Sequence, residues 1–515
     1  MKTKQLFFCG LTGLALLATS CSSNDEALNG GDGITSEGKT YAQIAISVAN
    51  SATTRALAGN TGDEEYGKNE EYTVNDLTVV LANENDIAMQ VITPTLKTVS
   101  DVEEADRQIR VTEPFACTPG TYKVYVLANY KNSQNALTPI IKGSTDMKAE
   151  FGITDIAKLS TMKNFFMTNV SAPKTQDIVK KGAGGKEVDD AGKEITDGKT
   201  DLNLLKVDVE RAVSKVTFAN TDDEPFEIKQ GANTIATATL EGASLINLNK
   251  KMYLVKDGTL ATNRPVVTND WPYPKDPNYN QTSIDKDYCV ANFEQRSATD
   301  FSAPSTATFY CPENTMEASA QLNGQTTGVV YKVKYTPNAD YYTELAKNGT
   351  DSYSKMFAKV LNLSDKADAI TETMFTDADN TEKTFYSYNG YVFRSKAGAL
   401  LYKAIATNTD GEAATVNTAF KSGNEEGIQT YTKGYCYYTA WIKHNPTSKV
   451  TMEQDKYGVV RNFWYELTVS SIKKLGYSLP TYENPTTPDD KDEAFIQVRV
   501  NIKKWRMVKQ NVDLQ

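Results

Sequence analysis

The stretch Tyr41-Ala42-Gln43-Ile44-Ala45-Ile46-Ser47-Val48 decides the fold class of this chain. Its apolar residues Ile44, Ile46 and Val48 alternate with small or polar ones, which is the period of a β-strand with one buried face. The chain also contains 28 tyrosines together with many threonines and valines, residue types that favour strands. We therefore expect a mainly β protein.

Short strand-like runs separated by turn residues continue from residue 72 to the end of the chain. They lie at 77–81, 121–127, 201–209, 207–218, 236–248 and 328–335. Apolar residues show helical spacing in two stretches, 354–363 and 397–406. The polar stretch 220–224 interrupts this pattern, so we expect one domain over residues 56–222 and a second over 223–515.

The overall composition limits the possible functions. A chain of 515 residues is long enough for two or more domains, and 40% hydrophobic residues can supply a core for each. The formal net charge of −10 argues against a nucleic-acid partner and against a polybasic membrane patch.

The first residues have the order of a lipoprotein signal peptide. Two lysines precede an apolar run over 6–18, and the small residues Ala18-Thr19-Ser20 then lead to Cys21. We expect signal peptidase to cut between Ser20 and Cys21, which removes residues 1–20, and we expect Cys21 to carry the lipid. The polar stretch 22–40 that follows is typical of a flexible tether. An ordinary signal peptide with a chance cysteine is the alternative.

A segment open to proteolysis follows the first strand. Ser51-Ala52-Thr53-Thr54-Arg55-Ala56 is small and polar, and the stretch 59–71 is acidic. Exposed stretches of this composition are where proteases cut folded domains. The first strand is therefore separated from the rest of the chain by a loop that a protease can reach.

The last strand has the same period of two. One face is apolar and consists of Ile496, Val498, Val500 and Ile502. The other face is polar and consists of Gln497, Arg499 and Asn501. Nothing after Trp505 is long enough to pair with this strand. Its apolar face needs a cover, either in its own sheet or in another molecule.

The sequence contains no motif for catalysis or metal binding. It lacks a P-loop, a nucleophile elbow, a GxGxxG turn and an HExxH helix. The single histidine, His444, precedes a turn and is expected at the surface. The acidic pairs Asp222-Asp223 and Asp489-Asp490 lie among turn residues and are expected to be solvated loop charges. We therefore predict a protein without catalytic residues, bound metal or cofactor.

Four cysteines remain once Cys9 and Cys21 are assigned to the leader and the lipid: Cys117, Cys289, Cys311 and Cys436. None of them lies in a CxxC or Cys/His cluster, which argues against zinc. They can form two disulfides in three connectivities. Four cysteines are sparse for so long a chain, however, and buried free thiols are our preferred interpretation.

Five stretches resemble segments of a known family. They are YTAWIKHN at 438–445, YGVVRNFWYELTV at 457–469, the run 496–505, VERAVSKV at 209–216 and YCPENT at 310–315. Together they resemble the Bacteroidales fimbrillins, in particular the Mfa-type major fimbrial subunits, or type V pilins. The resemblance implies two tandem transthyretin-like, Greek-key β-sandwich domains with a few short helices.

The resemblance also implies a route of assembly. Family members reach the cell surface as lipoproteins and are cut after an arginine, which removes the tether and the first strand. The C-terminal strand of another subunit then fills the groove by strand addition. In this chain the cut falls between Arg55 and Ala56, and the propeptide is 21–55. The donor strand falls near the C-terminus, with candidates Ile496, Val498, Val500, Ile502 and Trp505.

The function implied is that of a fimbrial shaft subunit serving adhesion and biofilm formation, with a lipid anchor in the outer membrane only in the precursor. Its partners would be copies of itself, accessory anchor and tip subunits, and the maturation protease. Two alternatives stay open: an anchor or tip subunit, and a cell-surface glycan-binding lipoprotein. The latter needs an exposed aromatic platform, which only the loop Trp271-Pro272-Tyr273-Pro274 offers.

Overall fold

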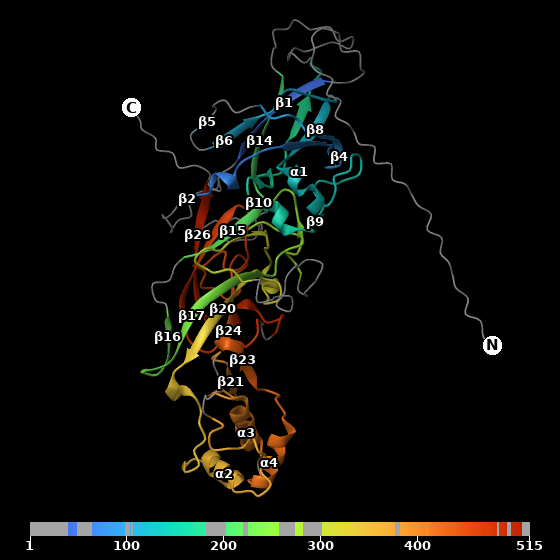
Figure 1. Ribbon diagram of the computed structural model, residues 1–515. Coiled ribbons are helices and arrows are strands. Elements are labelled where there is room, and N and C mark those ends of the chain that lie inside the picture. Colours follow the sequence, from blue (N-terminus) through green and yellow to red (C-terminus); the bar gives the residue numbers. More distant parts are fainter. Residues whose placement is uncertain are drawn as a thin grey trace, which may run out of the picture.

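The computed structural model describes residues 40–48, 64–97, 103–104, 107–181, 202–219, 225–256, 273–281, 301–375, 382–408, 410–480, 484–491 and 496–506. These residues form an elongated arrangement of β-sheets with a small helical region at one end (Figure 1). Helices are few and short, so the predicted mainly β fold class is confirmed.

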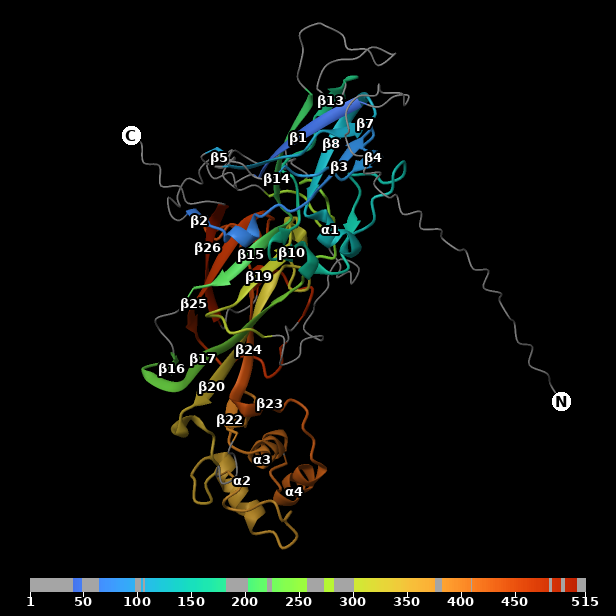
Figure 2. The ribbon, with the colours of Figure 1, turned by 45° about the horizontal axis from the view of Figure 1, so that its top comes forward.

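The first sheet contains ten strands and lies at the end of the molecule opposite to the helices α2 (Ser352–Leu361), α3 (Lys396–Thr407) and α4 (Ala413–Ser422). Its strands follow the order β4 (Ala88–Ile92), β3 (Leu77–Ala82), β8 (Gly120–Ala128), β12 (Met167–Asn169), β14 (Asn203–Arg211), β1 (Thr40–Val48), β6 (Arg107–Val111) and β5 (Glu103–Glu104). Two further strands are attached at the side: β13 (Thr175–Ile178) pairs with β8, and β7 (Phe115–Cys117) pairs with β1. Figure 2 brings this end of the molecule forward.

A β-sandwich follows the first sheet. One of its sheets has the order β19 (Thr308–Pro312), β15 (Val213–Phe218), β25 (Phe463–Ile472), β26 (Ile496–Arg506) and β2 (Glu64–Tyr66). The other has the order β16 (Phe226–Gln230), β17 (Asn233–Ile246), β20 (Gly328–Pro337) and β24 (Tyr435–Trp441). Both sheets contribute to one apolar core, which includes Tyr465 and Leu467 of β25 and Val329 and Val333 of β20. The chain passes from the first sheet to the sandwich at Ala212, between β14 and β15.

An insertion of residues 338–434 separates two strands that are direct neighbours in the sandwich. β20 and β24 pair antiparallel from Gly328↔Trp441 to Lys334↔Tyr435. The insertion contains α2 (Ser352–Leu361), α3 (Lys396–Thr407), α4 (Ala413–Ser422) and a small sheet of β22 (Tyr391–Phe393), β21 (Phe385–Tyr388) and β23 (Gln429–Tyr431). It has an apolar core of its own around Phe357, Phe375 and Tyr402. The sequence pattern did not predict this separate core.

The two helices expected from spacing are confirmed as α2 and α3. Each begins with a residue whose side chain caps the helix: Asp351 accepts from the backbone of Ser354, and Ser395 accepts from that of Gly398. The apolar spacing did not predict α4, which is capped at its C-terminal end by Gly423 in a left-handed conformation with φ of 63°.

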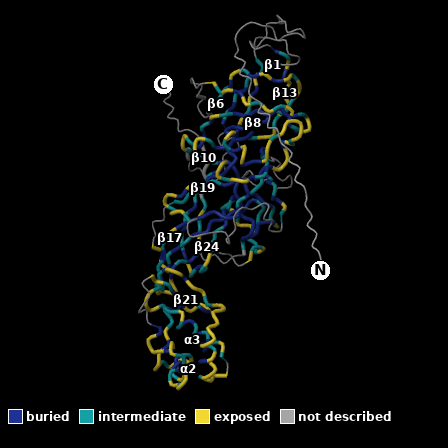
Figure 3. Tube along the Cα trace, turned by 45° about the vertical axis from the view of Figure 1, so that its right-hand side comes forward, coloured by how far each residue is buried: buried dark blue, intermediate teal, exposed yellow. Residues whose placement is uncertain are grey.

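The remaining elements are short. They include short 3-10 helices, the helix α1 (Tyr130–Ser133) and the two-residue strands β9 (Phe151–Gly152) with β18 (Lys251–Met252) and β10 (Ser160–Thr161) with β11 (Asn164–Phe165). Figure 3 shows that buried residues run through the first sheet and the sandwich, whereas the surface of the insertion is largely exposed.

Candidate functional site: the groove filled by the first strand

The first strand lies in the interior of the first sheet, between strands from two different parts of the chain. β1 pairs parallel with β14, from Ala42↔Asn203 to Val48↔Val209. On its other side it pairs antiparallel with β6, from Ala45↔Val111, and with β7, from Thr40↔Cys117. We call the space between β14 and the pair β6/β7 the β1 groove. A strand with neighbours on both sides has its backbone groups paired along both edges.

The side chains of β1 alternate as the sequence predicted. The five that point into the molecule are completely buried: Thr40, Ala42, Ile44, Ile46 and Val48. The four between them are half-buried. This strand therefore belongs to the core of the first sheet, although it stands at the N-terminal end of the described chain.

Among the described strands, β1 alone joins β14 to β6 and β7. The end of β6 is otherwise bonded to the segment that follows β4, where the backbone N–H of Lys97 donates to the carbonyl of Val111 at 2.9 Å. If β1 were absent, β14 would lose its parallel neighbour and β6 and β7 would lose their antiparallel one. Both edges would then present unpaired backbone groups, which is a template for another strand.

Two buried polar side chains of the groove hold the backbone of β1. Thr112 lies where β6 ends and before Pro114, which has no backbone N–H for a ladder. There the backbone N–H of Ile44 donates to Thr112 Oγ1 at 3.1 Å, and the backbone N–H of Thr112 donates to the carbonyl of Ile44 at 3.0 Å. At the start of β14, Asn203 Nδ2 donates to the carbonyl of Tyr41 at 2.9 Å. Sequence reasoning missed both residues, although Pro114 signals a break in pairing.

The end of the groove at Thr40 is polar. Thr40 Oγ1 donates to the carbonyl of Val179 at 2.8 Å and accepts from the backbone N–H of Lys181 at 2.6 Å. Gln43, on the outer face, donates through Nε2 to the carbonyl of Thr112 at 2.8 Å. The groove therefore combines an apolar floor with polar contacts that fix how far along it a strand lies.

The last strand is paired within its own subunit in this structure. β26 runs antiparallel to β25 from Ile472↔Ile496 to Phe463↔Lys504. Its other edge pairs with β2 at Glu64↔Lys504, Glu65↔Trp505 and Tyr66↔Arg506. The sequence left open whether the last strand packs in its own sheet or in another molecule. In this structure it packs in its own sheet. The backbones of Ile502 and Trp505 lie on β26, and the candidates Ile496, Val498 and Val500 precede them.

The apolar face of β26 is only partly covered in that position. Ile496 is buried, with 5% of its surface exposed, whereas Val498 and Val500 are half-buried against the core of the sandwich. Gln497 and Arg499 are exposed. The corresponding face of β1 is buried completely.

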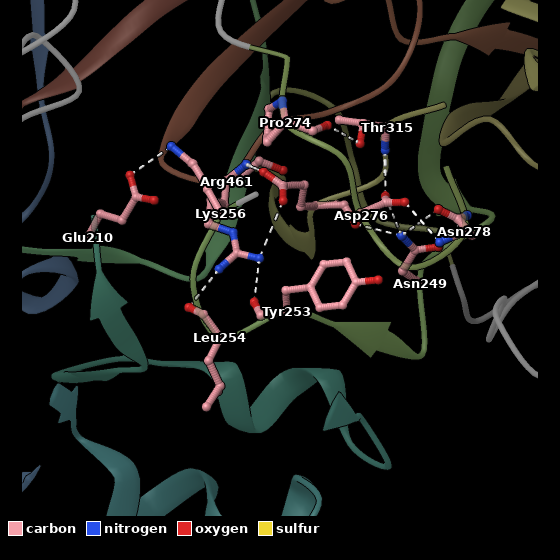
Figure 4. Close-up of polar contacts among 12 residues, drawn as sticks. Glu210, Asn249, Tyr253, Leu254, Lys256, Pro274, Asp276, Asn278, Thr315 and Arg461 are labelled. Atoms are coloured by element: carbon pink, nitrogen blue, oxygen red, sulfur yellow. Dashed lines mark hydrogen bonds and ion pairs between the residues drawn. The ribbon is translucent and has the colours of Figure 1, made fainter. Parts of the chain in front are cut away.

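A second polar cluster is buried at the junction of the first sheet and the sandwich, in the segment Gly458-Val459-Val460-Arg461-Asn462. Arg461 donates through Nη1 to the carbonyl of Leu254 at 3.2 Å and through Nη2 to that of Tyr253 at 2.7 Å (Figure 4). The same Nη2 pairs with Glu313 at 3.3 Å. Gly458 has φ of +110°, and a Cβ there would lie 2.5 Å from the carbonyl oxygen of Asn314, so only glycine fits.

An aspartate that the sequence analysis did not single out lies in the same cluster. Asp276 accepts from the backbone N–H groups of Thr315 at 2.6 Å and Asn278 at 3.0 Å, and from Asn249 Nδ2 at 3.0 Å (Figure 4). Burial raises its pKa well above the ordinary value, and these hydrogen bonds oppose that rise. The cluster joins distant loops and is closed to solvent, which is the arrangement of a structural network.

Two family models match the chain, one over each of these regions. The model described as "Major fimbrial subunit protein (FimA)" matches residues 42–206, which begin in β1 and end in β14. The model described as "Major fimbrial subunit protein type IV, Fimbrillin, C-terminal" matches residues 429–511, which include β24, β25 and β26. Over these two ranges the chain is similar to the fimbrillins, the major fimbrial subunit proteins. This similarity points to a structural role in cell-surface fimbriae.

Three solved structures are similar to this chain. A putative cell adhesion protein from Parabacteroides distasonis has 14% sequence identity and a TM-score of 0.39, over 91% of this chain and 99% of that one. A fimbrilin from Porphyromonas gingivalis has 13% identity and a TM-score of 0.37, again over 91% and 99%. The tip fimbrial protein Mfa3 of the same organism has 13% identity and a TM-score of 0.28, over 91% and 100%.

The predicted processing residues of this chain lie outside the described residues. These are Ser20 and Cys21 at the signal peptidase site, and Arg55 and Ala56 at the maturation site. Both cleavage sites and the lipidation of Cys21 stay predictions.

The expectation of a surface histidine was wrong. His444 is completely buried, and its Nδ1 lies 2.7 Å from the hydroxyl of Tyr465. The rings of Phe463 and Tyr273 lie 5.4 Å and 5.6 Å away, measured between ring centroids. The turn residues after His444 suggested exposure, but an aromatic pocket built from distant segments encloses it.

The expectation of solvated charge at Asp489-Asp490 was also wrong. Asp489 is buried and accepts a hydrogen bond from the hydroxyl of Thr326. Asp490 pairs with Lys456 at 2.8 Å and accepts from the hydroxyl of Tyr457 at 2.7 Å. Burial acts to raise the pKa of Asp490, but these partners outweigh it and lower the pKa. The pair Asp222-Asp223 lies outside the described residues.

The loop considered for glycan stacking does not present its tyrosine. Tyr273 is buried, and its hydroxyl donates to the carbonyl of Tyr457 at 2.6 Å and accepts from the backbone of Met316 at 2.9 Å. Trp271 lies outside the described residues. Tyr273 is therefore unavailable to a carbohydrate.

The described cysteines are free and buried, as preferred from their sparseness: Cys117, Cys311 and Cys436. Burial raises the pKa of Cys117 to about 11 and of the other two to about 12. Cys289 lies outside the described residues. Within those residues, no helix has the length and hydropathy of a membrane span, and no group of acidic, histidine or cysteine side chains has the arrangement of a metal site.

Proposed function

We propose that this chain is a shaft subunit of a surface fimbria that is exported as a lipoprotein, cut after Arg55 and polymerised by strand exchange. The observation that carries the proposal is the place of β1. A strand that comes first in the described chain fills the interior of a sheet, and no other described strand joins its two neighbours.

The energetics favour refilling of the groove once β1 is gone. Ile44, Ile46 and Val48 are completely buried. Burying three such side chains stabilises a protein by roughly 5–9 kcal/mol, an upper estimate. An empty groove loses that stabilisation and also exposes two unpaired strand edges. A strand from another molecule restores both.

The C-terminal strand is the proposed donor. β26 is the last described element, and the apolar candidates Val498 and Val500 are only half-buried beside β25. Donation requires β26 to leave β25, and the backbone pairing that it gives up there is regained along the groove. Copies of the chain would in this way form a homopolymer.

The lipid on Cys21 serves transport in this proposal. It holds the precursor in the outer membrane and is discarded with residues 21–55 when the maturation protease cuts. The proposed domains are an N-terminal one over 56–222 and a C-terminal one over 223–515, and β15, near the end of the first range, pairs into a sheet of the sandwich. The polymer would act in adhesion and biofilm formation, together with accessory anchor and tip subunits.

Proteolysis of the purified precursor tests the proposal. An arginine-specific protease should release the segment ending at Arg55 and convert the monomer into ladders that resist SDS. An Arg55→Gln variant, treated in the same way, should remain monomeric. Cleaved protein that stays monomeric at high concentration would refute the shaft function.

The N-terminus of protein extracted from the cell surface separates the related roles. A chain that begins at Ala56 supports a polymerising subunit. A blocked, lipidated Cys21 contradicts the shaft role and supports an anchor subunit or a surface-bound lipoprotein.

A further inference from the structure

The end of the last strand is paired with a short strand that follows the proposed cut site. β26 pairs with β25 only as far as Lys504. Its other edge pairs parallel with β2, from Glu64↔Lys504 to Tyr66↔Arg506, and β2 lies beside the end of β26 in Figures 1 and 2. Among the described strands, Trp505 and Arg506 therefore pair with β2 alone. β2 holds the part of β26 that extends beyond β25.

The two strands carry opposite charges where they meet. Residues 63–65 are one aspartate and two glutamates, and the end of β26 contains Lys503, Lys504 and Arg506. The register places Glu64 directly opposite Lys504, and an acid and a base at opposite positions of neighbouring strands stabilise the pairing. On its other edge Lys504 is opposite Phe463, which carries no charge. Charge therefore favours β2 as the neighbour at this end of β26.

β2 is anchored on both sides in the uncut chain. After β2 the chain enters the short helical turn η2 (Asn69–Glu71), where Glu71 is completely buried and pairs with Lys215 of β15 at 2.8 Å. Before β2, residues 49–63 connect it to β1, which is embedded in the first sheet. A short strand tied at both ends to buried elements has little freedom to separate from its neighbour.

A cut after Arg55 removes one of these two anchors. Residues 56–63 then precede β2 as a free end of the chain. β2 has three residues, and so short a strand next to a free end frays more readily than the same strand inside a chain. The pairing of β2 with β26 becomes weaker, although both strands keep their sequence and their charges.

We propose that β2 is a latch on β26, a strand that must separate before β26 can leave its sheet, and that cleavage after Arg55 loosens this latch. The inference rests on the proposed strand exchange and adds how the donor strand is controlled. One cut then acts on both parts of the exchange: it releases β1 and weakens the hold on β26. Before the cut both strands stay in place, so subunits do not associate early.

Charged residues on a short edge strand also have a simpler role, which is to keep other chains from pairing with the sheet. A strand with that role alone would cover β26 in the same way before and after the cut. It would also not need to separate during assembly. These two differences decide between the latch and the edge cover.

Hydrogen exchange of residues 496–506 tests the latch in the uncut full-length protein, where no assembly takes place. Glu64→Lys should speed exchange in this segment about three- to tenfold, because it sets two bases at opposite positions. Lys504→Glu should do the same, and the swapped variant E64K/K504E should return to the rate of the parent. Glu425→Lys, which changes an exposed pair with Lys396 in the insertion, is the matched control and should leave the rate unchanged.

A labelling pulse directly after the cut tests whether cleavage loosens the latch. In the parent, diluted so that ladders have not yet formed, exchange of residues 496–506 should rise at least threefold over the uncut protein. The same treatment of Arg55→Gln, which is not cut there, should leave exchange unchanged. A cut parent that exchanges at the uncut rate would overturn the proposal and leave β2 as an edge cover.

A reversible cross-link tests whether β2 must separate from β26 during assembly. In the variant E64C/K504C, with Cys289 replaced by alanine, the new cysteines lie on strands about 4.8 Å apart, a spacing that a disulfide spans. The other described cysteines are buried and react slowly. After the cut, the oxidised variant should give at least tenfold fewer SDS-resistant ladders than the parent, and dithiothreitol should restore them.

The possible results separate the latch from the proposed function. Equal ladders from the oxidised and the reduced variant, or exchange that ignores both E64K and K504E, would overturn the latch and leave strand exchange intact. No ladders from the cut parent would instead refute the proposed function. The exchange rates of the uncut variants would still decide whether β2 holds β26, because they do not depend on assembly.

Discussion

At the scale of single residues, buried charges join the first sheet to the sandwich. Glu71, in the short helical turn η2 (Asn69–Glu71), pairs with Lys215 at 2.8 Å and accepts from the hydroxyl of Tyr310 at 2.5 Å. Its carbonyl accepts from Arg211 Nε at 2.8 Å, and Arg211 Nη1 donates to Asn462 at 2.8 Å. Glu71 follows the proposed cut site, so this ion pair would hold the start of the mature chain against both regions.

Substituting Glu71 should destabilise the protein strongly. Glu71→Gln leaves Lys215 buried without its counter-charge, which costs about 3–5 kcal/mol for a pair of this kind. The control Glu227→Gln breaks an exposed pair with Lys229 and should cost less than about 1 kcal/mol. Urea denaturation of the uncleaved protein measures both. Equal losses of unfolding free energy in the two variants would show that the buried Glu71–Lys215 pair stabilises the protein no more than the exposed pair does.

A second prediction concerns the contribution of Asp86 to stability at low pH. Burial acts to raise the pKa of Asp86, but hydrogen bonds from Lys123, Lys148 and Tyr125 outweigh it and hold the pKa below its ordinary value of 3.8. A carboxylate with a lowered folded-state pKa contributes stability above about pH 4, and this contribution is lost as the pH falls through the folded-state pKa.

Asp86→Asn should therefore cost about 1–3 kcal/mol at pH 7. The difference from the parent should shrink as the pH is lowered from 4 to 2. Asparagine also accepts the left-handed backbone of Asp86, with φ of 64°, so strain does not confuse the comparison. Denaturant titrations of the parent and the variant at several pH values measure this difference in stability. A difference that is constant down to pH 2 would contradict the assignment.

At the scale of elements, the first strand behaves as a removable part of a sheet. Its inward face is apolar and its backbone is held on both edges. Recognition of a strand by such a groove depends on main-chain pairing and on alternate side-chain pockets. A free peptide with the β1 sequence contains everything that the groove contacts.

A synthetic peptide of residues 40–48, added to freshly cleaved subunits, should therefore block ladder formation in proportion to its concentration. A peptide of the same composition with its apolar residues moved to the alternate positions should not, because its polar residues would face the groove floor. Ladder intensity on SDS gels measures the effect. Equal inhibition by the two peptides would contradict a groove with alternating pockets.

At the scale of the whole molecule, the β1 groove and the insertion lie at opposite ends (Figures 1 and 2). The chain leaves the sandwich after β20, folds the insertion around its own core and returns in the neighbouring strand β24. A unit built in this way can lose its own stability without disturbing the pairing that surrounds it.

Phe357→Ala should test this independence. Phe357 is buried and packs edge-to-face on Phe375 with ring centroids 5.5 Å apart. Its truncation should destabilise the insertion by about 3–5 kcal/mol and leave ladder formation intact. Limited proteolysis of residues 338–434 measures the first effect, with the exposed Lys355→Ala on the same helix as control. Loss of ladders in a protein whose sandwich stays folded would show that the insertion takes part in assembly.

The local sequence pattern was enough to predict which face of the first strand is buried and where two of the helices lie. Alternation predicted which side chains of the first strand are buried, and the spacing of apolar residues predicted α2 and α3. It failed where distant segments build the surroundings. His444 and Asp489 stand among turn residues, and residues far away in the chain enclose them. Thr112 and Asn203 escaped notice because a side chain that holds another strand's backbone leaves no periodic signal.

The sequence by itself determined that this protein is mainly β, that its first and last strands each have one apolar face, and that its N-terminus resembles that of a lipoprotein. These features depend on neighbours along the chain. Only the tertiary structure decided that β1 lies between β14 and β6, that β26 rests beside β25, and that the insertion has its own core. The reason is physical: alternation states which face a strand buries, but its partners are chosen by the packing of segments that are distant in the chain.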